Sequence, residues 1–144
     1  MSTIRDVIAK KGAGVATISP DATALDAAHQ MNERRIGALC VVDGETLVGM
    51  FTERDLLNRV VSARVDPASA RVADVMTSDV ITCGLDGKTK DCMAVMSHKR
   101  IRHLPVVEGG KLVGLISTGD LMALQVDEKQ AFIEDLYRYL HGRT

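Results

Sequence analysis

Two ten-residue stretches determine how the chain is organised. Residues 47–56 have the sequence LVGMFTERDL, and residues 112–121 have the sequence LVGLISTGDL. In each stretch an apolar run predicts a buried strand, and a hydroxyl residue followed three positions later by Asp predicts the start of a helix. The rest of the chain can be placed relative to these two copies.

The two stretches belong to a longer internal repeat. Residues 15–57 align with residues 80–122 at an offset of 65, and 16 of the 43 pairs are identical. The preceding segments 4–8 and 72–76 also match, but at an offset of 68, so the first copy has three extra residues near Lys10–Gly14. Two copies indicate a pseudo-symmetric pair and not a solenoid. Units of roughly 60 residues are marginal alone, so we expect the two copies to share one core.

The hydrophobic periodicity predicts an α/β (α+β) fold of two β-α-β-β-α repeats. We expect Asp21 or Thr23 to cap the second helix, Gly37 to end it, and Thr52 to cap the helix after the third strand. Helices are predicted at 3–10, 24–35, 55–62, 72–76 and 88–99 and from Gly119 onward. Strands are predicted at 15–18, 38–42, 46–51, 80–83, 104–107 and 111–116. The domain boundaries that follow are 1–62 for repeat one, 63–71 for the linker, 72–124 for repeat two and 125–144 for a C-terminal helix.

The C-terminal helix is expected to be amphipathic, because apolar residues recur at helical spacing from Leu121 to Leu140 among many charges. Gly142 is expected to end it. Such a helix needs an apolar surface to cover. That surface is either the protein's own sheet or a second subunit, and the sequence leaves both open.

The overall composition excludes several classes of function. The net charge of −1 gives no reason to expect binding to nucleic acid or to an anionic membrane. No apolar run approaches the roughly 18 residues that would span a bilayer, and the N-terminus does not resemble a signal segment, so a cytoplasmic location is expected. The three cysteines form no Cys-x-x-Cys pair, and small buried residues are the favoured interpretation. The four scattered histidines form no recognisable triad or metal motif, so neither catalysis nor a metal is expected.

At this point the pattern resembles a tandem pair of cystathionine-β-synthase (CBS) domains. The resemblance rests on the twice-present Gly-x-x-Thr/Ser-x-x-Asp signature, the Asp-Val-Ile and Asp-Val-Met lead-ins, and the phrase IRHLPVV at residues 101–107. It covers nearly the whole chain, from Ile4 to Leu124. It implies one module in which the repeats pack about a pseudo-twofold axis with two equivalent clefts. It also implies a regulatory role through adenosine-containing ligands and a tendency to form homodimers.

The resemblance implies two crossed ligand sites, each using residues of both repeats. Site one comprises Thr52, Arg54, Asp55, Val80, Ile81, Thr82, Arg102 and His103. Site two comprises Ser117, Gly119, Asp120, Val15, Ala16, Thr17, Arg35 and Gly37. In both, the Asp would accept hydrogen bonds from the two ribose hydroxyls, and the helix N-terminus would favour phosphate.

The two sites are expected to differ. Arg54, Arg102 and His103 of site one correspond to Gly119, Gly37 and Ala38, so site two lacks the phosphate-binding groups. Site one is therefore the expected phosphate site. A simpler interpretation of Thr52 and Asp55 is a capping box.

A cluster of cations occurs where two helices are predicted to end: Arg34, Arg35, Lys99, Arg100 and Arg102. The cluster also suits the C-terminal ends of helices.

The expected ligands are AMP, ADP, ATP or NAD, with S-adenosylmethionine ranked below them and no metal required. A homodimer and an unidentified protein effector are the expected protein partners. The alternative is a ligand-free module for dimerisation or protein interaction.

Overall fold

The computed structural model describes residues 2–12 and 14–141, so the predicted helix end at Gly142 lies outside the described residues. The described elements follow the predicted order closely. Repeat one contains α1 (Ile4–Lys11), β1 (Thr17–Ile18), α2 (Ala24–Arg34), β2 (Ala38–Asp43), β3 (Thr46–Thr52), α3 (Glu53–Asp55) and the π-helix η1 (Leu56–Val61). Repeat two contains α4 (Val72–Val75), α5 (Thr89–Lys99), β4 (His103–Glu108), β5 (Lys111–Ser117) and α6 (Thr118–His141).

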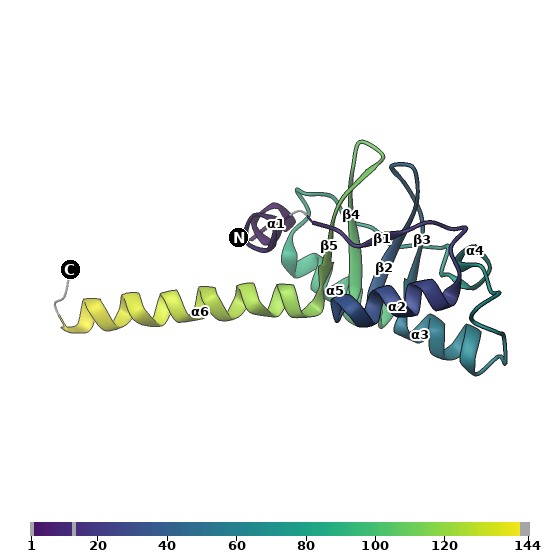
Figure 1. Ribbon diagram of the computed structural model, residues 1–144. Helices are drawn as coiled ribbons and strands as arrows, with labels where there is room; N and C mark the ends of the chain where they lie inside the picture. Colours follow the sequence, from purple (N-terminus) through teal and green to yellow (C-terminus); the bar gives the residue numbers. More distant parts are fainter. Residues whose placement is uncertain (1, 13, 142–144) are drawn as a thin grey trace.

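Two sheets form the centre of the body (Figure 1). The first has the order β1-β2-β3, and the second contains β4 and β5. Each β-hairpin turns through glycines with positive φ, at Gly44 in the first and at Gly109 and Gly110 in the second. Each also has a register shift at the same repeat position, between Val41 and Val42 in the first hairpin and between the residues 65 later in the second.

The strand predicted at 80–83 is the clearest error. Only Cys83 pairs there, in an isolated parallel bridge to Val106. In repeat one the backbone N–H of Cys40 donates to the carbonyl of Ala16 at 3.1 Å and extends the β1–β2 ladder. The residue 65 positions after Cys40 is Pro105, which has no backbone N–H. The equivalent ladder bond to Ile81 therefore cannot form, and the second sheet has one strand fewer.

The end of α2 also differs from the prediction. Arg35 caps the helix in the left-handed conformation, with φ of 53°, and its N–H contacts the carbonyls of Met31 and Asn32. Arg100 ends α5 in the same way, with φ of 55°. Gly37 is therefore not the residue that ends α2. The predicted caps at Thr23 and Thr52 are confirmed, because each side chain accepts the backbone N–H of the Asp three residues later.

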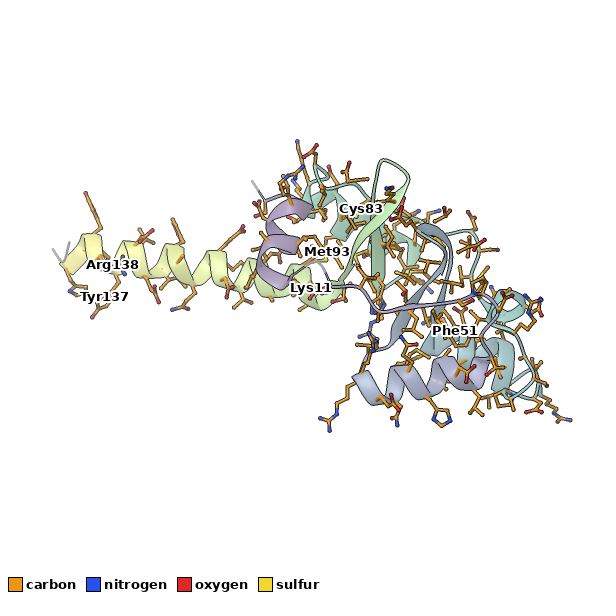
Figure 2. The ribbon with its side chains drawn as sticks, turned by 45° about the horizontal axis from the view of Figure 1, so that its top comes forward. Lys11, Phe51, Cys83, Met93, Tyr137 and Arg138 are labelled. Carbon is orange, nitrogen blue, oxygen red and sulfur yellow. The ribbon has the colours of Figure 1, made fainter. Side chains whose placement is uncertain are left out.

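The repeats exchange their first helices. Ile4 and Val7 of α1 pack in the core of repeat two, with Met96 and Leu104 among others. Val72 and Val75 of α4 pack in the core of repeat one, a core that includes Phe51 (Figure 2). A third cluster that includes Ala38, Cys40 and Met50 joins the two sheets. Each repeat therefore completes the core of the other, and the module is one folding unit.

Helix α6 is continuous and projects from the body (Figure 1). Near its start it is held by the N-terminal segment, through an ion pair between Lys10 of α1 and Asp127 and a hydrogen bond from Ser2, which precedes α1, to Glu128. Its distal half does not cover the protein's own sheet, and large apolar side chains there are exposed, up to 84% for Tyr139. The sequence left two surfaces open for this helix, the protein's own sheet or a second subunit. The distal half of α6 does not cover the protein's own sheet. In the described residues no helix has the length and apolar character needed to cross a membrane.

Candidate functional site

A cleft of about 990 Å³ opens where the ends of β3 and β5 meet. Its walls come from four segments: the strand-to-helix junctions at 50–58 and 117–119, the segment 77–81, and the connection 99–103, together with Gly37. Both repeats therefore contribute to one cavity. Its residues are Gly37, Met50, Thr52, Glu53, Arg54, Asp55, Leu57, Asn58, Thr77, Asp79, Val80, Ile81, Lys99, Arg100, Ile101, Arg102, His103, Ser117, Thr118 and Gly119.

The cleft brings together most of the residues predicted for site one. Thr52, Arg54, Asp55, Val80, Ile81, Arg102 and His103 all line it, and Thr82 does not. Of the residues predicted for site two, Ser117, Gly119 and Gly37 line the same cleft. The others, Asp120, Val15, Ala16, Thr17 and Arg35, lie outside its lining. The described cleft thus contains most of the residues predicted for site one, together with three of those predicted for site two.

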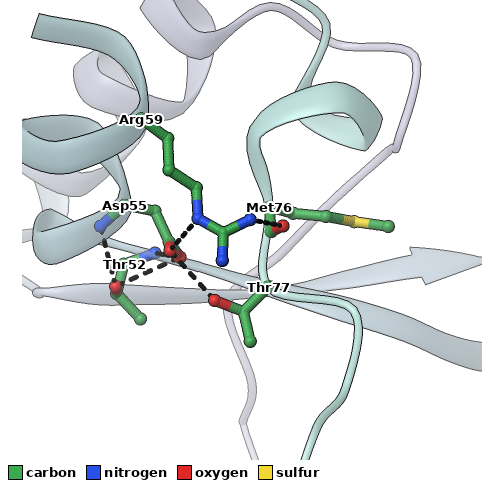
Figure 3. Close-up of polar contacts among 5 residues, drawn as sticks. All are labelled: Thr52, Asp55, Arg59, Met76 and Thr77. Atoms are coloured by element: carbon green, nitrogen blue, oxygen red, sulfur yellow. Dashed lines mark hydrogen bonds and ion pairs between the residues drawn. The ribbon is translucent and has the colours of Figure 1, made fainter. Parts of the chain in front are cut away.

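Asp55 lies at the wall of the cleft and has several hydrogen-bond partners (Figure 3). Its Oδ2 accepts the backbone N–H of Thr52 at 3.0 Å and lies 3.2 Å from the Thr52 hydroxyl. Its Oδ1 accepts the Thr77 hydroxyl at 2.9 Å and lies 3.5 Å from Nε of Arg59. Asp55 is only 5% exposed. The capping interpretation of Thr52 and Asp55 is therefore confirmed as geometry, and any ligand contact must exchange with one of these partners.

Asp120 occupies the equivalent position of repeat two with different partners. Its Oδ2 accepts the backbone N–H of Ser117 at 2.8 Å and pairs with Nζ of Lys11 at 2.7 Å. The same Nζ donates to the carbonyl of Leu115 at 2.6 Å. Burial alone would raise the pKa of the Asp120 carboxyl, but the hydrogen bonds from Lys11 and Ser117 outweigh it and lower the pKa below 3.8. The carboxyl is therefore ionised at neutral pH.

The pseudo-symmetry is visible at the middle of the cleft. Glu53 donates its backbone N–H to the carbonyl of Gly37 at 3.0 Å, and Thr118 donates to the carbonyl of Arg102 at 3.0 Å. The Glu53 side chain lies over Gly37, where a Cβ would be 3.0 Å from Oε1. Gly37 thus makes room for an acidic side chain, while the equivalent Arg102 supplies a cation.

The charges of the lining are mixed, with more cations than carboxylates. Four cations, Arg54, Lys99, Arg100 and Arg102, line the cleft with three carboxylates, Glu53, Asp55 and Asp79. Of the cation cluster predicted from the sequence, Arg34 and Arg35 are not part of the lining. Asp55 is buried with donors around it, so the cations act mainly against two exposed acids. A phosphate group would find several positive partners here.

His103 lies at the centre of these charges. Burial lowers the pKa of its imidazole below 6.5, and the nearby cations of Arg102 and Lys11 lower it further, against the opposing effect of Asp120 and Glu53. His103 is therefore neutral at neutral pH and presents one donor and one acceptor nitrogen.

Several lining residues were missed by the sequence analysis. Thr77 and Asp79 lie on the segment between α4 and Val80, and Glu53 and Asn58 follow Thr52. Thr77 lies one residue past the matched lead-in, and the residue 68 earlier is Ala9, which has no hydroxyl. The repeat comparison therefore gave no signal for it. For Asp79, an acidic residue directly before the predicted Val80 contact was the available signal.

The thiols are not suited to nucleophilic chemistry. Burial raises the pKa of Cys40 to about 12 and that of Cys83 to about 12. Thiolate is the reactive form, so both groups remain protonated and unreactive at neutral pH. Within residues 2–12 and 14–141, no three His, Cys, Asp or Glu side chains are grouped closely enough to hold a metal ion.

Comparison with known proteins gives a consistent result. The model of the family described as the CBS domain matches residues 4–62 and 72–127. The chain is 32% identical to the CBS domain-containing protein YhcV of Bacillus subtilis, over 91% of each chain. It is also 32% identical to the mitochondrial CBS domain-containing protein CBSX3 of Arabidopsis thaliana, over 98% of this chain and 73% of that protein. A solved structure of a putative signal-transduction protein with CBS domains from Burkholderia ambifaria has 38% identity and a TM-score of 0.83. That match covers 88% of this chain and 95% of the other.

Proposed function

This chain belongs to the CBS domain family as a tandem pair and is a regulatory module, and from that premise we propose that its cleft binds an adenine nucleotide. The observation that carries the proposal is a cavity between the repeats that is lined by five apolar side chains, a buried carboxylate and four cations. These three features match base, ribose and phosphate respectively. AMP, ADP, ATP and NAD are the candidate ligands, with S-adenosylmethionine below them.

The apolar part of the cleft suits the adenine ring. Met50, Leu57, Val80, Ile81 and Ile101 line it. Flat aromatic bases bind well between aliphatic side chains, because both faces leave water. We assign the base to this wall, next to Val80 and Ile81.

The ribose is assigned to Asp55. Its Oδ1 is held by the neutral hydroxyl of Thr77, which also lines the cleft. A ribose hydroxyl can replace another hydroxyl at a carboxylate with little change in hydrogen-bond energy. The exchange would leave the Thr52 N–H bond to Oδ2 in place and would keep α3 capped.

The phosphate is assigned to the cations of the lining, and Arg102 is the principal contact. Arg102 is exposed and lies past the end of α5, beside the strand that begins with His103. Arg54, Lys99 and Arg100 are further candidate phosphate contacts, since all line the cleft. Several phosphates, as in ATP, can therefore be accommodated as well as one.

We further propose that a second copy of this chain covers α6. Met122, Val126, Lys129, Ile133, Leu136 and Leu140 follow one another at alternating spacings of four and three residues. That is the spacing of a coiled-coil seam. Apart from Lys129 these side chains are apolar and exposed, so the seam faces solvent in one chain. A parallel partner would place Lys129 against its own copy, so an antiparallel pair is favoured.

Titration calorimetry with AMP, ADP, ATP, NAD, S-adenosylmethionine and adenosine tests the ligand proposal. Micromolar binding of a nucleotide and weaker binding of adenosine are expected, because only the nucleotide reaches the cations. Absence of heat with every compound would contradict the proposal and favour the ligand-free interaction module, for which the exposed seam on α6 is the supporting observation. Hydrogen exchange with and without ligand then tests signalling, through altered protection at the surface offered to the effector protein.

A further inference from the structure

We propose that two copies of α6 pair antiparallel about Ala131, so that the end of each helix packs beside the cleft of the other chain. The inference rests on the proposed covering of α6 by a second copy. It extends that proposal to the register of the pair and to the place where each helix ends. Figure 1 shows that α6 extends well past the body.

One side of α6 is already engaged by the protein's own body. Leu121 and Leu124 on this side pack in the core of repeat two. On the same side, Asp127 and Glu128 make polar contacts with the N-terminal segment. The later residues of this side are mostly polar, namely Ala131, Glu134, Asp135 and Arg138. The apolar residues of this side therefore end where the helix leaves the body.

The opposite side of α6 is exposed and mostly apolar along its whole length. It consists of the seam and the positions that flank the seam, and the only charge among them is that of Lys129. These exposed residues are Met122, Ala123, Gln125, Val126, Lys129, Gln130, Phe132, Ile133, Leu136, Tyr137, Tyr139 and Leu140. The chain has two Phe, two Tyr and no Trp, and three of these four aromatic residues are in this set. Aromatic residues are enriched at protein interfaces, so this side has the composition of a contact surface.

The spacing of the seam is the same when it is read in either direction. Successive seam residues are separated by four, three, four, three and four positions, so a helix that runs the other way presents a matching pattern. When Ala131 of both chains lies at the centre, Met122 faces Leu140 of the second copy, and Val126 faces Leu136. Apolar residues thus meet apolar residues at both ends of the seam.

Lys129 separates the antiparallel pair from the parallel one. In a parallel pair in register, the two Lys129 ammonium groups would face each other inside an apolar seam, where like charges are costly. In the antiparallel pair each Lys129 faces Ile133 of the second copy, and the two lysines are about 6 Å apart along the helix axis. The aliphatic part of the lysine can then cover the isoleucine while the ammonium stays in water.

The flanking residues also fit the antiparallel arrangement. Tyr137 and Tyr139 flank the far half of the seam, whereas Ala123 and Gln125 flank the half near the body. Antiparallel pairing about Ala131 places Tyr137 beside Ala123 and Tyr139 beside Gln125 of the second copy. Large side chains then meet smaller ones, as close packing favours. A parallel pair would instead gather the tyrosines of both chains at one end.

This register brings the end of one chain's helix to the cleft of the other chain. Ser117, Thr118 and Gly119 line the cleft where α6 begins, and Met122 follows three residues after Gly119. Leu140 of the second copy, which faces Met122, therefore packs about one helical turn from the cleft wall. Each cleft is thereby next to a contact made by the other chain.

Disulfide crosslinking of the purified full-length protein tests the register. Met122→Cys and Leu140→Cys are made singly and together and are oxidised beside the wild type, whose three cysteines are buried or half-buried. The double variant, and a mixture of the two single variants after subunit exchange, should form crosslinked dimers. Each single variant alone should form none, because identical residues would be roughly 27 Å apart along the axis. Ala131→Cys, on the side away from the seam, is the matched control and should not crosslink.

The outcomes separate the register from the pairing itself. A crosslink formed by Met122→Cys alone would show a parallel pair. A dimer whose double variant forms no crosslink would show another register. Both results would overturn the inference and leave the second copy on α6. A wild-type protein that is monomeric in sedimentation velocity would overturn the proposed covering of α6 and the inference with it.

A second measurement applies if the cysteine substitutions in the seam dissociate the dimer. Spin labels are then attached to Ala131→Cys and, separately, to Arg138→Cys, both on the side away from the seam. In the antiparallel pair the two labels at Ala131 are level, whereas those at Arg138 are offset by roughly 21 Å along the axis. The distance between labels should therefore be longer for Arg138→Cys than for Ala131→Cys. Equal distances would show a parallel pair and overturn the inference.

Discussion

The hydroxyl of Thr77 lies 2.9 Å from Oδ1 of Asp55 and joins the two repeats at the wall of the cleft. Thr77 follows the first helix of repeat two, and Asp55 lies at the helix start that follows the third strand of repeat one. The bond therefore serves the fold and the candidate ligand site together. Asp55 is nearly inaccessible to water, so a water molecule cannot readily replace the Thr77 hydroxyl as hydrogen-bond donor.

Removal of this hydroxyl should destabilise the protein. In Thr77→Val the carboxylate keeps its bonds to Thr52 but loses the Thr77 donor, and the free energy of unfolding should fall by roughly 2 kcal/mol. Urea denaturation measures the change. Thr82→Val replaces an exposed threonine five residues later and should change stability by less than about 0.5 kcal/mol. Equal effects of the two substitutions would show that the hydrogen bond to Asp55 does not contribute to the free energy of unfolding.

The two repeat-related aspartates should contribute unequally to binding. Asp55→Asn should weaken AMP binding by about tenfold or more, because the ribose hydroxyls lose a charged acceptor. Asp120→Asn should change the affinity by less than about twofold, because its carboxylate is engaged with Lys11. Calorimetry on both variants, with unfolding curves to confirm that each is folded, makes the comparison. Similar losses would mean that the ranking of the sites is wrong.

Arg102 should distinguish nucleotides from the nucleoside. Arg102→Met keeps the length of the side chain and removes its charge, so AMP affinity should fall by about tenfold while adenosine affinity stays the same. The salt dependence of AMP binding should weaken as well. Arg5→Met, which breaks a surface ion pair with Asp86, is the control and should leave binding unchanged. An equal loss for adenosine would mean that Arg102 shapes the cleft and does not bind phosphate.

His103 should make the stability depend on pH in a defined window. The pKa of His103 is lowered in the folded state relative to 6.5, so the unfolded chain binds more protons between the two values. The contribution is present in full above pH 6.5 and is lost as the pH falls through the folded pKa. His103→Gln should therefore show a smaller loss of stability between pH 7.5 and pH 5 than the wild type in urea denaturation. His98→Gln, at an exposed position, should behave as the wild type does; an equal change in both variants would contradict the assignment.

The seam on α6 should control the oligomeric state. Val126→Glu and Ile133→Glu each place a charge in the proposed helix–helix contact and should convert a dimer to a monomer. Ala131→Glu introduces the same side chain on the opposite face of the same helix and should leave the dimer intact. Sedimentation velocity at several concentrations separates these outcomes. A wild-type protein that remains monomeric at high concentration would rule out the second copy as the occupant of this face.

The order of elements could be predicted because the repeat supplies each element twice. The offset of 65 placed both hairpins, and the Thr-x-x-Asp pattern placed the helix cap at Thr52 correctly, although the helix begins at Glu53 and not at the predicted Asp55. The failures arise where one copy lacks what the other provides. Pro105 cannot donate the ladder bond that Cys40 makes, so the fourth predicted strand is absent. Local patterns also gave no sign that α1 and α4 would pack in each other's repeat, because that exchange depends on tertiary contacts.

The candidate site could be predicted where its residues lie within the repeated block. Thr52, Arg54, Asp55 and Arg102 follow from family positions, and the structure places them in one cleft. Thr77 and Lys11 lie outside the block that repeats at an offset of 65, so no alignment of the copies could link them to Asp55 and Asp120. Their contacts are made with residues that are distant in the sequence and belong to the other repeat, and no sequence pattern indicates such tertiary contacts.

Helix α6 begins at the cleft and ends far from it. Ser117, Thr118 and Gly119 line the cavity, and the helix then continues without a break to His141. Twenty-four residues of α-helix extend roughly 36 Å, so a rotation of about 5° at Thr118 would move the far end by roughly 3 Å. In the proposed function the helix would act as a lever arm that begins at the ligand site, and a small movement of the cleft residues would become a larger displacement at the far end, where a partner could bind.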